Sequence, residues 1–126
     1  MIKVLVVDDA RIMRNILKKT IKEKFNDFHI IEAKDGQDAI DLFKKEQPHL
    51  ITMDITMERK NGLDAAREIL KIDNNAKIIM VTSLGQEKML SECVQVGVRD
   101  YIVKPFSKER ILSSISTALD EKENKK

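Results

Sequence analysis

Residues 4–9 of the chain read VLVVDD, a run of four apolar residues that ends at once in two aspartates. Valine favours extended backbone, and unbroken apolarity is typical of a strand that is covered on both faces, as in a parallel sheet. Asp8 and Asp9 place two charges directly after this run. The stretch therefore predicts a central parallel strand whose carboxyl end carries two acids.

Four further apolar runs follow, each separated from the last by room for a helix. The predicted strands are residues 2–7, 29–33, 50–53, 77–81 and 101–103. Between them, apolar residues recur at helical spacing, as in residues 63–70. Predicted N-caps are Asp35, Asn61 and Ser107, and Gly97 is predicted to end the fourth helix. Strict alternation of strands and helices predicts an α/β fold, a doubly wound five-stranded parallel sheet with right-handed crossovers.

The composition describes one globular domain. Of the 126 residues, 42% are hydrophobic and 35% are charged, which is too apolar for a disordered chain. The 23 basic and 21 acidic residues nearly balance, whereas a dedicated nucleic-acid binder carries a concentrated basic excess. No apolar run approaches the ~20 residues of a membrane span, and the N-terminus lacks the pattern of a signal peptide. We expect a cytoplasmic protein with one domain over residues 1–120 and a charged C-terminal tail over residues 121–126.

Polar residues follow four of the predicted strands at their carboxyl ends, where ligands bind to open parallel sheets. They are Asp8, Asp9, Asp54, Thr82 and Lys104. Two carboxylates ~4 Å apart repel by roughly 4 kcal/mol at an effective dielectric near 20, so three together need protons, a cation or Lys104 close by. Hard carboxylate oxygens suit Mg²⁺, which also binds phosphate, and a carboxylate can attack phosphorus to form an acyl phosphate. The pattern predicts a phosphoryl-accepting, metal-dependent site.

These motifs together resemble the receiver domain of two-component response regulators. The segments that carry the resemblance are VLVVDD, MDIT and NG around Asp54, VTS at Thr82, and YIVKPF, and the similarity extends from residue 2 to about residue 119. The family has a flavodoxin-like (βα)5 fold with strand order 2-1-3-4-5. That order is an implication of the resemblance, because these residues alone do not dictate it.

The resemblance also implies roles for individual residues. Asp54 would accept the phosphoryl group, and Mg²⁺, for which Mn²⁺ can substitute, would bind Asp54 and Asp9 directly. Asp8 would act on the metal largely through water, and the backbone carbonyl of Thr56 would be a further ligand. These assignments make Asp8, Asp9, Asp54 and Thr56 the expected metal site.

Three more positions match residues that respond to the phosphoryl group in the family. Lys104 would pair with it, Thr82 would move to bond it, and Tyr101 matches an aromatic whose orientation follows activation. The Lys104–Pro105 bond matches a cis peptide in the family, which X–Pro bonds permit at modest cost. The resemblance therefore implies a switch as well as a site.

The implied function is a phosphorylation-activated signalling switch that takes its phosphoryl group from a histidine kinase of the CheA type. It would be no enzyme apart from catalysing its own aspartyl phosphorylation and dephosphorylation. The length and the stretches DITM, NAKIIMVTSLGQ and DYIVKPF resemble single-domain chemotaxis receivers of the CheY type. The expected partners are then a flagellar motor switch protein or another output target and a phosphatase, with a monomeric chain and no nucleic acid or membrane.

The loop after Asp54 departs from the family pattern, which often has proline there. Here Met57 is followed by residues 58–60, Glu-Arg-Lys, so we expect a more mobile loop, with an acid near the pocket mouth. A plain solvated loop is the competing interpretation of these charges. Thr56 and Leu84 flank the path of attacking water in the family. Because an apolar Leu84 cannot position water, we expect slow to moderate self-dephosphorylation.

Several alternatives stay open. Within the family, the chain could instead be the receiver of a transcriptional regulator, cut from a longer chain, and the altered loop is compatible with a phosphorylation-independent interaction module. A metal-dependent phosphatase acting on other molecules has less support, because no second nucleophile motif is present. Among single residues, Asp8 and Asp9 could simply cap a helix, and Tyr101 could be an ordinary edge-strand aromatic. The lone Cys93 is expected to be a buried, inert thiol.

Overall fold

The five predicted strands form one sheet in the computed structural model of the protein, which describes residues 1–120. The strands are β1 (Lys3–Val7), β2 (His29–Ala33), β3 (Leu50–Met53), β4 (Ile78–Thr82) and β5 (Asp100–Val103). The helices are α1 (Arg11–Lys24), α2 (Gly36–Glu46), α3 (Gly62–Ile72), α4 (Glu87–Val96) and α5 (Lys108–Asp120). All paired strands are parallel, in the order β2-β1-β3-β4-β5. The expected flavodoxin-like topology is confirmed.

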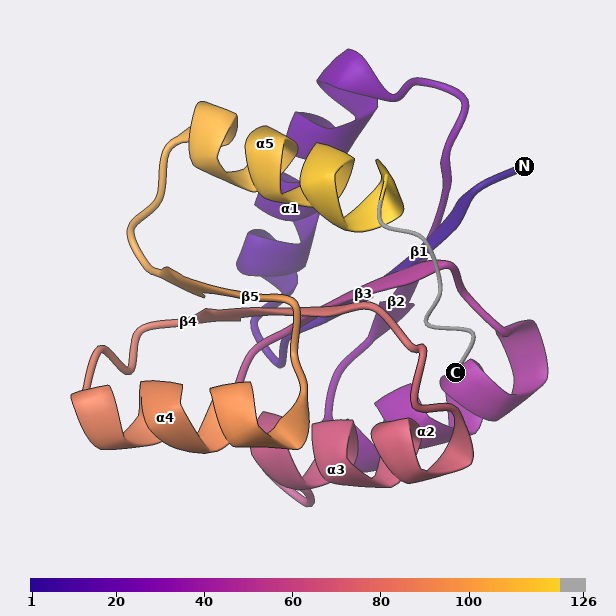
Figure 1. Cartoon of the computed structure of the whole chain (residues 1–126). Helices are drawn as coiled ribbons and strands as arrows, with labels where there is room; N and C mark the ends of the chain where they lie inside the picture. The colour runs from indigo at the N-terminus through magenta and orange to yellow at the C-terminus, as the bar shows by residue number, and fades with distance from the viewer. Residues whose placement is uncertain (121–126) are drawn as a thin grey trace.

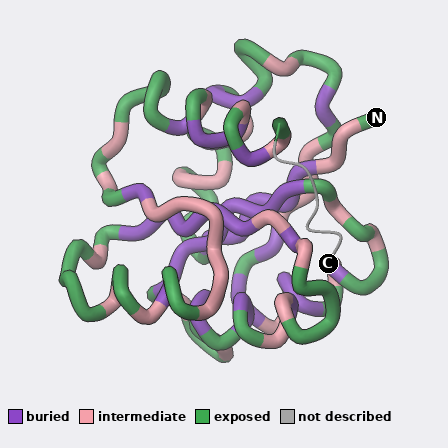
Figure 2. The backbone as a smooth tube through the Cα atoms, in the orientation of Figure 1, coloured by how far each residue is buried: buried purple, intermediate pink, exposed green. Residues whose placement is uncertain are grey.

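Helices cover both faces of the sheet, α1 and α5 on one and α2, α3 and α4 on the other (Figure 1). Successive side chains of a strand point to opposite faces, so β1 supplies both cores. Val4 and Val6 pack in the core under α1 and α5, whereas Leu5 and Val7 pack in the core under α2 and α3. Buried residues accordingly run through the middle of the molecule, and most exposed residues lie on the helices and loops outside it (Figure 2). The continuous apolarity of VLVV is thus a consequence of burial on both sides.

The edge strands are less buried than the central three. His29 at the start of β2 is exposed, and Val103 at the end of β5 is 44% exposed. The fourth strand is displaced by one residue from its predicted run and includes Thr82, whose partner in the ladder is Val103. A polar residue can end a strand and still pair, so apolarity alone places that boundary one residue early. Within residues 1–120, no helix is both long and apolar enough to cross a membrane.

Capping contacts are observed at the predicted helix boundaries. The Asp35 side chain accepts from the backbone N–H of Asp38 at 2.8 Å, and Asn61 caps α3 in the same way at 2.9 Å. The Ser107 hydroxyl accepts from a backbone N–H in the first turn of α5 at 3.1 Å. Gly97 ends α4 in the left-handed conformation, with φ of 111°. The tail predicted for residues 121–126 lies outside the described residues.

Candidate functional site

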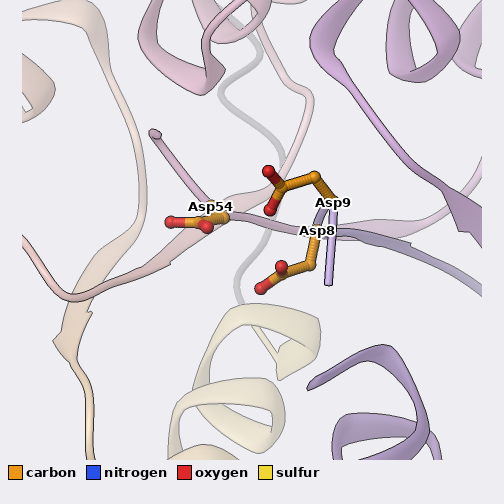
Figure 3. A group of neighbouring side chains, drawn as sticks. All are labelled: Asp8, Asp9 and Asp54. Atoms are coloured by element: carbon orange, nitrogen blue, oxygen red, sulfur yellow. The ribbon is translucent and has the colours of Figure 1, made fainter. Parts of the chain in front are cut away.

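Asp8 and Asp54 lie side by side because they directly follow two neighbouring strands. The parallel ladder continues one residue past each strand: the Asp54 N–H donates to Val7 at 3.0 Å, and the Asp8 N–H donates to Ala33 at 3.1 Å. Asp8 is 2% exposed and Asp54 7% exposed, whereas Asp9 faces solvent. One oxygen from each of the three carboxylates lies within 4.8 Å of the others, as Figure 3 illustrates. The acids predicted to meet at this edge do meet.

Backbone groups orient the two buried carboxylates. Oδ1 of Asp54 accepts from the N–H of Ile55 at 2.8 Å, and Oδ1 of Asp8 accepts from the N–H of Ala10 at 2.9 Å. Arg14, one turn into α1, donates to the backbone carbonyl of Asp8 at 2.7 Å. Arg14, which also pairs with Glu32 at 3.0 Å, thereby helps to fix the backbone at Asp8, a contact that the sequence pattern did not suggest.

Lys104 enters the site from the opposite side. Its backbone N–H donates to the Thr82 carbonyl at 2.8 Å, and the peptide bond to Pro105 is cis, as the resemblance implied. Its ammonium lies 2.8 Å from Oδ2 of Asp8 and 3.5 Å from Oδ2 of Asp54. Lys104 is therefore the fourth charged group of one cluster, and its side chain is only 17% exposed.

Burial governs the protonation of Asp54. Loss of solvent raises the pKa of its carboxyl, the charge of Lys104 opposes that rise, and the charge of Asp8 adds to it. The ionised form of Asp54 is thus poorly solvated and flanked by a like charge. A divalent cation would relieve both penalties, because it places opposite charge beside the ionised carboxylates.

The donor set fits Mg²⁺. Three carboxylates offer hard oxygen atoms, and Asp9 is open to solvent, so coordinated water can remain on the ion. The three aspartates of the sequence-based metal site therefore lie together. Thr56 is an exposed residue of the following loop, and the role of its carbonyl stays a prediction.

Thr82 and Tyr101 are joined through one residue of the β4–α4 loop. The fully buried Thr82 hydroxyl accepts from the Leu84 N–H at 3.3 Å, and the hydroxyl of half-buried Tyr101 donates to the Leu84 carbonyl. Thr82 also lowers the pKa of Asp54 by hydrogen bonding to it. Since Leu84 acts here through its backbone, no feature of its side chain could have revealed the link.

The loop between Asp54 and α3 is fixed at several points. A Cβ on Gly62 would lie 1.9 Å from the Asp54 carbonyl oxygen, so only glycine permits this approach. Arg59 and Lys60, which could have been free solvated charges, pair with Asp35 and Glu68 at 2.8 and 2.7 Å. Both cations therefore make ion pairs, although Glu58 and Arg59 remain exposed to solvent.

Beside the acid cluster lies an open depression of about 560 Å³. Its lining residues are Asp9, Lys34, Asp35, Glu58 and Arg59. Glu58 does lie near the pocket mouth, as predicted, because it shares this depression with Asp9. The acids of the site thus continue into a mixed-charge surface formed by the β2–α2 and β3–α3 loops.

Comparison with known proteins gives a consistent result. Residues 4–116 match the family described as response regulator receiver domain. Protein CcdB of Bacillus subtilis is 44% identical over 94% of this chain and 98% of its own length. Chemotaxis protein CheY of Thermotoga maritima is 43% identical over 90% of this chain and 94% of its own length. These alignments cover nearly the full length of both relatives.

Solved structures agree. A chain of the CheX–CheY–BeF3–Mg²⁺ complex of Borrelia burgdorferi superposes with a TM-score of 0.89 at 29% identity, covering 95% of this chain and 90% of the other. A DNA-binding response regulator of the LuxR family from Staphylococcus aureus gives a TM-score of 0.88 at 26% identity, covering 95% and 100%. The same architecture therefore occurs in both chemotaxis and transcriptional proteins.

Proposed function

This chain belongs to the response regulator receiver domain family, and we propose that it is a signalling switch activated by phosphorylation of Asp54. The observation that carries the proposal is the cluster itself. Three carboxylates lie within 4.8 Å of one another, and the half-buried ammonium of Lys104 pairs with only two of them, Asp8 and Asp54. A polyanionic ligand would therefore need a metal ion beside these acids, and Lys104 is placed to pair with it. A site of this charge balance suits phosphoryl transfer to a carboxylate.

In the proposed reaction, an oxygen of Asp54 attacks phosphorus, a phosphorus–oxygen bond forms, and the phosphorus–nitrogen bond of a phosphohistidine breaks. The leaving imidazole keeps the electron pair and takes a proton from solvent. Mg²⁺, when bound by Asp8, Asp9 and Asp54, would neutralise the phosphoryl oxygens. Lys104 would exchange its present pairing with Asp8 for the phosphoryl group. The chain would be no enzyme toward other substrates.

The output would pass through Thr82 and Tyr101. Both hydroxyls meet at Leu84, so a pull of Thr82 toward the phosphoryl group would disturb the loop that also holds Tyr101. The affected surface would comprise α4, β5 and α5. Phosphorylation would shift a two-state equilibrium that exists beforehand. We expect self-dephosphorylation to be slow to moderate, because the side chain of Leu84 cannot hold water.

A role in chemotaxis is the favoured context. CheY of Thermotoga maritima is 43% identical to this chain, almost the same as the 44% of CcdB. The Borrelia complex contains a CheY together with CheX and Mg²⁺. The partners proposed for this chain are a CheA-like histidine kinase, a flagellar motor switch protein and a phosphatase. The receiver of a transcriptional regulator is the second candidate, favoured by the LuxR-family structure.

Labelling with acetyl phosphate, with and without Mg²⁺, tests the proposal. Intact-protein mass spectrometry should show one added phosphoryl group only with Mg²⁺, and none in Asp54→Asn. Asp41→Asn, which alters an exposed aspartate of α2, is the matched control and should label normally. Unchanged labelling of Asp54→Asn would refute the assignment.

Two other results would favour a different function. No labelling of the wild-type chain at any Mg²⁺ concentration would favour a phosphorylation-independent interaction module. Repeated turnover of a phosphate ester such as p-nitrophenyl phosphate would favour a phosphatase. A pull-down with the beryllofluoride form against the unmodified form would then identify the output partner.

A further inference from the structure

The loop that borders the metal site is closed at its base. The N–H of Gly62 donates to the carbonyl of Ile55 at 2.8 Å, and the side chain of Met57 packs against the core. The loop thus leaves the sheet at Asp54, rises through Thr56 and returns at Gly62. The path of its backbone next to the metal site depends on what holds the far end.

The far end is a tight turn centred on Arg59. The N–H of Lys60 donates to the carbonyl of Glu58 at 2.8 Å, a bond from residue i+2 to residue i that closes a γ-turn. Arg59 has φ of 64°, in the left-handed region that glycine and asparagine occupy far more readily than arginine. This conformation is unfavourable by itself and persists only if other contacts hold it.

A bidentate ion pair supplies those contacts. Nε and Nη2 of Arg59 donate to Oδ2 and Oδ1 of Asp35 at 2.8 and 3.0 Å. Asp35 is buried and also caps α2, and the next residue, Gly36, donates its N–H to the Lys60 carbonyl at 2.9 Å. The pairing lowers the pKa of Asp35 and raises that of Arg59, so both stay charged. The turn is therefore bound to a rigid helix end.

We infer that Arg59 is a positioning residue: its fork on Asp35 fixes the turn of the β3–α3 loop and thereby sets the affinity of the adjoining site for Mg²⁺. This inference rests on the proposed function, in which Asp8, Asp9 and Asp54 hold the metal. Its spatial basis is the depression that Arg59 and Asp35 share with Asp9. Only three residues of chain separate Asp54 from the fixed turn.

Charge and positioning predict opposite results when Arg59 is removed. A positive side chain beside three acids repels Mg²⁺, so its removal should tighten Mg²⁺ binding if charge alone matters. If Arg59 positions the loop, its removal should weaken binding. Contacts that orient the ligands of a metal change affinity by about tenfold or more when lost. The sign of the change therefore separates the two effects.

The test measures Mg²⁺ dissociation constants by isothermal titration calorimetry, and Tm without metal. Arg59→Lys keeps the charge but loses the fork, and Arg59→Gly loses the fork while relieving the strained φ. We expect both to bind Mg²⁺ about tenfold more weakly. Because Asp35 is buried and loses its partner, both variants should lower Tm. Arg59→Gly also relieves the strained φ, so its Tm should fall less than that of Arg59→Lys although its loss of Mg²⁺ affinity is as large, which separates positioning from a general loss of stability.

Arg67→Lys is the matched control. Arg67 is exposed on α3 and pairs with Asp64 at 3.2 Å, away from the turn, so its variant should bind Mg²⁺ as the wild type does. Equal or tighter binding by both Arg59 variants would overturn the inference and leave the proposed function intact. A wild-type chain that binds no Mg²⁺ would overturn both. A loss of Mg²⁺ affinity that follows the fall in Tm across the two variants, small in Arg59→Gly and large in Arg59→Lys, would also overturn the inference.

Discussion

The ammonium of Lys104 lies 2.8 Å from a carboxylate oxygen of Asp8, although 96 residues separate the two in the chain. Asp8 is almost completely buried, and Lys104 covers it from the loop after β5. The pair joins the start of the chain to its last strand. The same ammonium lies 3.5 Å from a carboxylate oxygen of Asp54, so it neutralises this second acid only partly.

Replacing Lys104 by methionine should destabilise the protein. Breaking a buried ion pair leaves the remaining charge buried and unpaired, so the free energy of unfolding should fall by about 3 kcal/mol without Mg²⁺. Saturating Mg²⁺ should recover part of the loss, because the ion replaces the missing cation in the folded state only. Urea unfolding with and without Mg²⁺ measures both effects. Lys108→Met is the control: its pair with Glu23 is exposed, and its loss should be below about 1 kcal/mol. Equal losses in the two variants would contradict the argument.

Replacing Asp54 by asparagine should stabilise the fold while abolishing labelling. Burial raises the pKa of Asp54, with a further rise from Asp8, so its ionised form is disfavoured in the folded state at neutral pH. A neutral amide removes that penalty, and we expect a gain of about 1 kcal/mol. Thermal unfolding at pH 7 without Mg²⁺ measures it. A lower Tm than the wild type would show that the attraction of Lys104 outweighs burial.

Replacing Gly62 by alanine should strongly destabilise the fold for steric reasons. The added Cβ would lie 1.9 Å from the Asp54 carbonyl oxygen, which is backbone and cannot move aside as a side chain can, and 2.9 Å from Cγ of Met53. We expect a loss of about 3 kcal/mol and weaker Mg²⁺ binding, since the loop must shift. Gly85→Ala is the matched control, because its nearest contact would be an ordinary 3.8 Å to Val103. Chemical denaturation of both variants should separate them clearly, and similar midpoints would disprove the clash.

Asp100 should make stability depend on pH in the acid range. The guanidinium of Arg110, with the Ser114 hydroxyl, lowers the pKa of Asp100 from 3.8 to about 2. A lowered pKa gives stability that is present above the unfolded value and is lost as pH falls toward 2. Allowing for partial exposure, the wild type should exceed Asp100→Asn by about 1–2 kcal/mol at pH 6. Urea unfolding of both proteins between pH 6 and pH 2 should show that difference shrinking, and a constant difference would contradict the assignment.

The sequence predicted most of the fold because burial on two faces leaves a strong pattern. The continuous apolar run of residues 4–7 and the caps Asp35 and Asn61 were recognisable from local chemistry. The strand order was available only through the family resemblance, since parallel strands of similar composition do not reveal their neighbours. The boundary at Thr82 was shifted by one residue because a polar side chain can still pair in a ladder.

The main site could also be predicted, because its acids directly follow strands and such ends converge in a parallel sheet. Its supporting contacts could not. Arg59 and Asp35 lie 24 residues apart in two loops, and neither belongs to a periodic pattern. Arg14 and the backbone of Leu84 act on single atoms whose positions depend on the finished fold. Sequence patterns identify which side chains lie together in the site, whereas the contacts that orient each of them depend on the tertiary structure.

The closeness of Lys104 to Asp8 has a consequence for synthesis of the protein. A ribosome makes the acids of β1 and β3 long before it makes Lys104, so a growing chain carries buried-site aspartates without their counter-charge. Full charge balance arrives only when β5 has emerged and joined the edge of the sheet. We therefore expect chains arrested before residue 104 to be resistant to phosphorylation, with competence appearing abruptly once Lys104 and β5 have joined the fold.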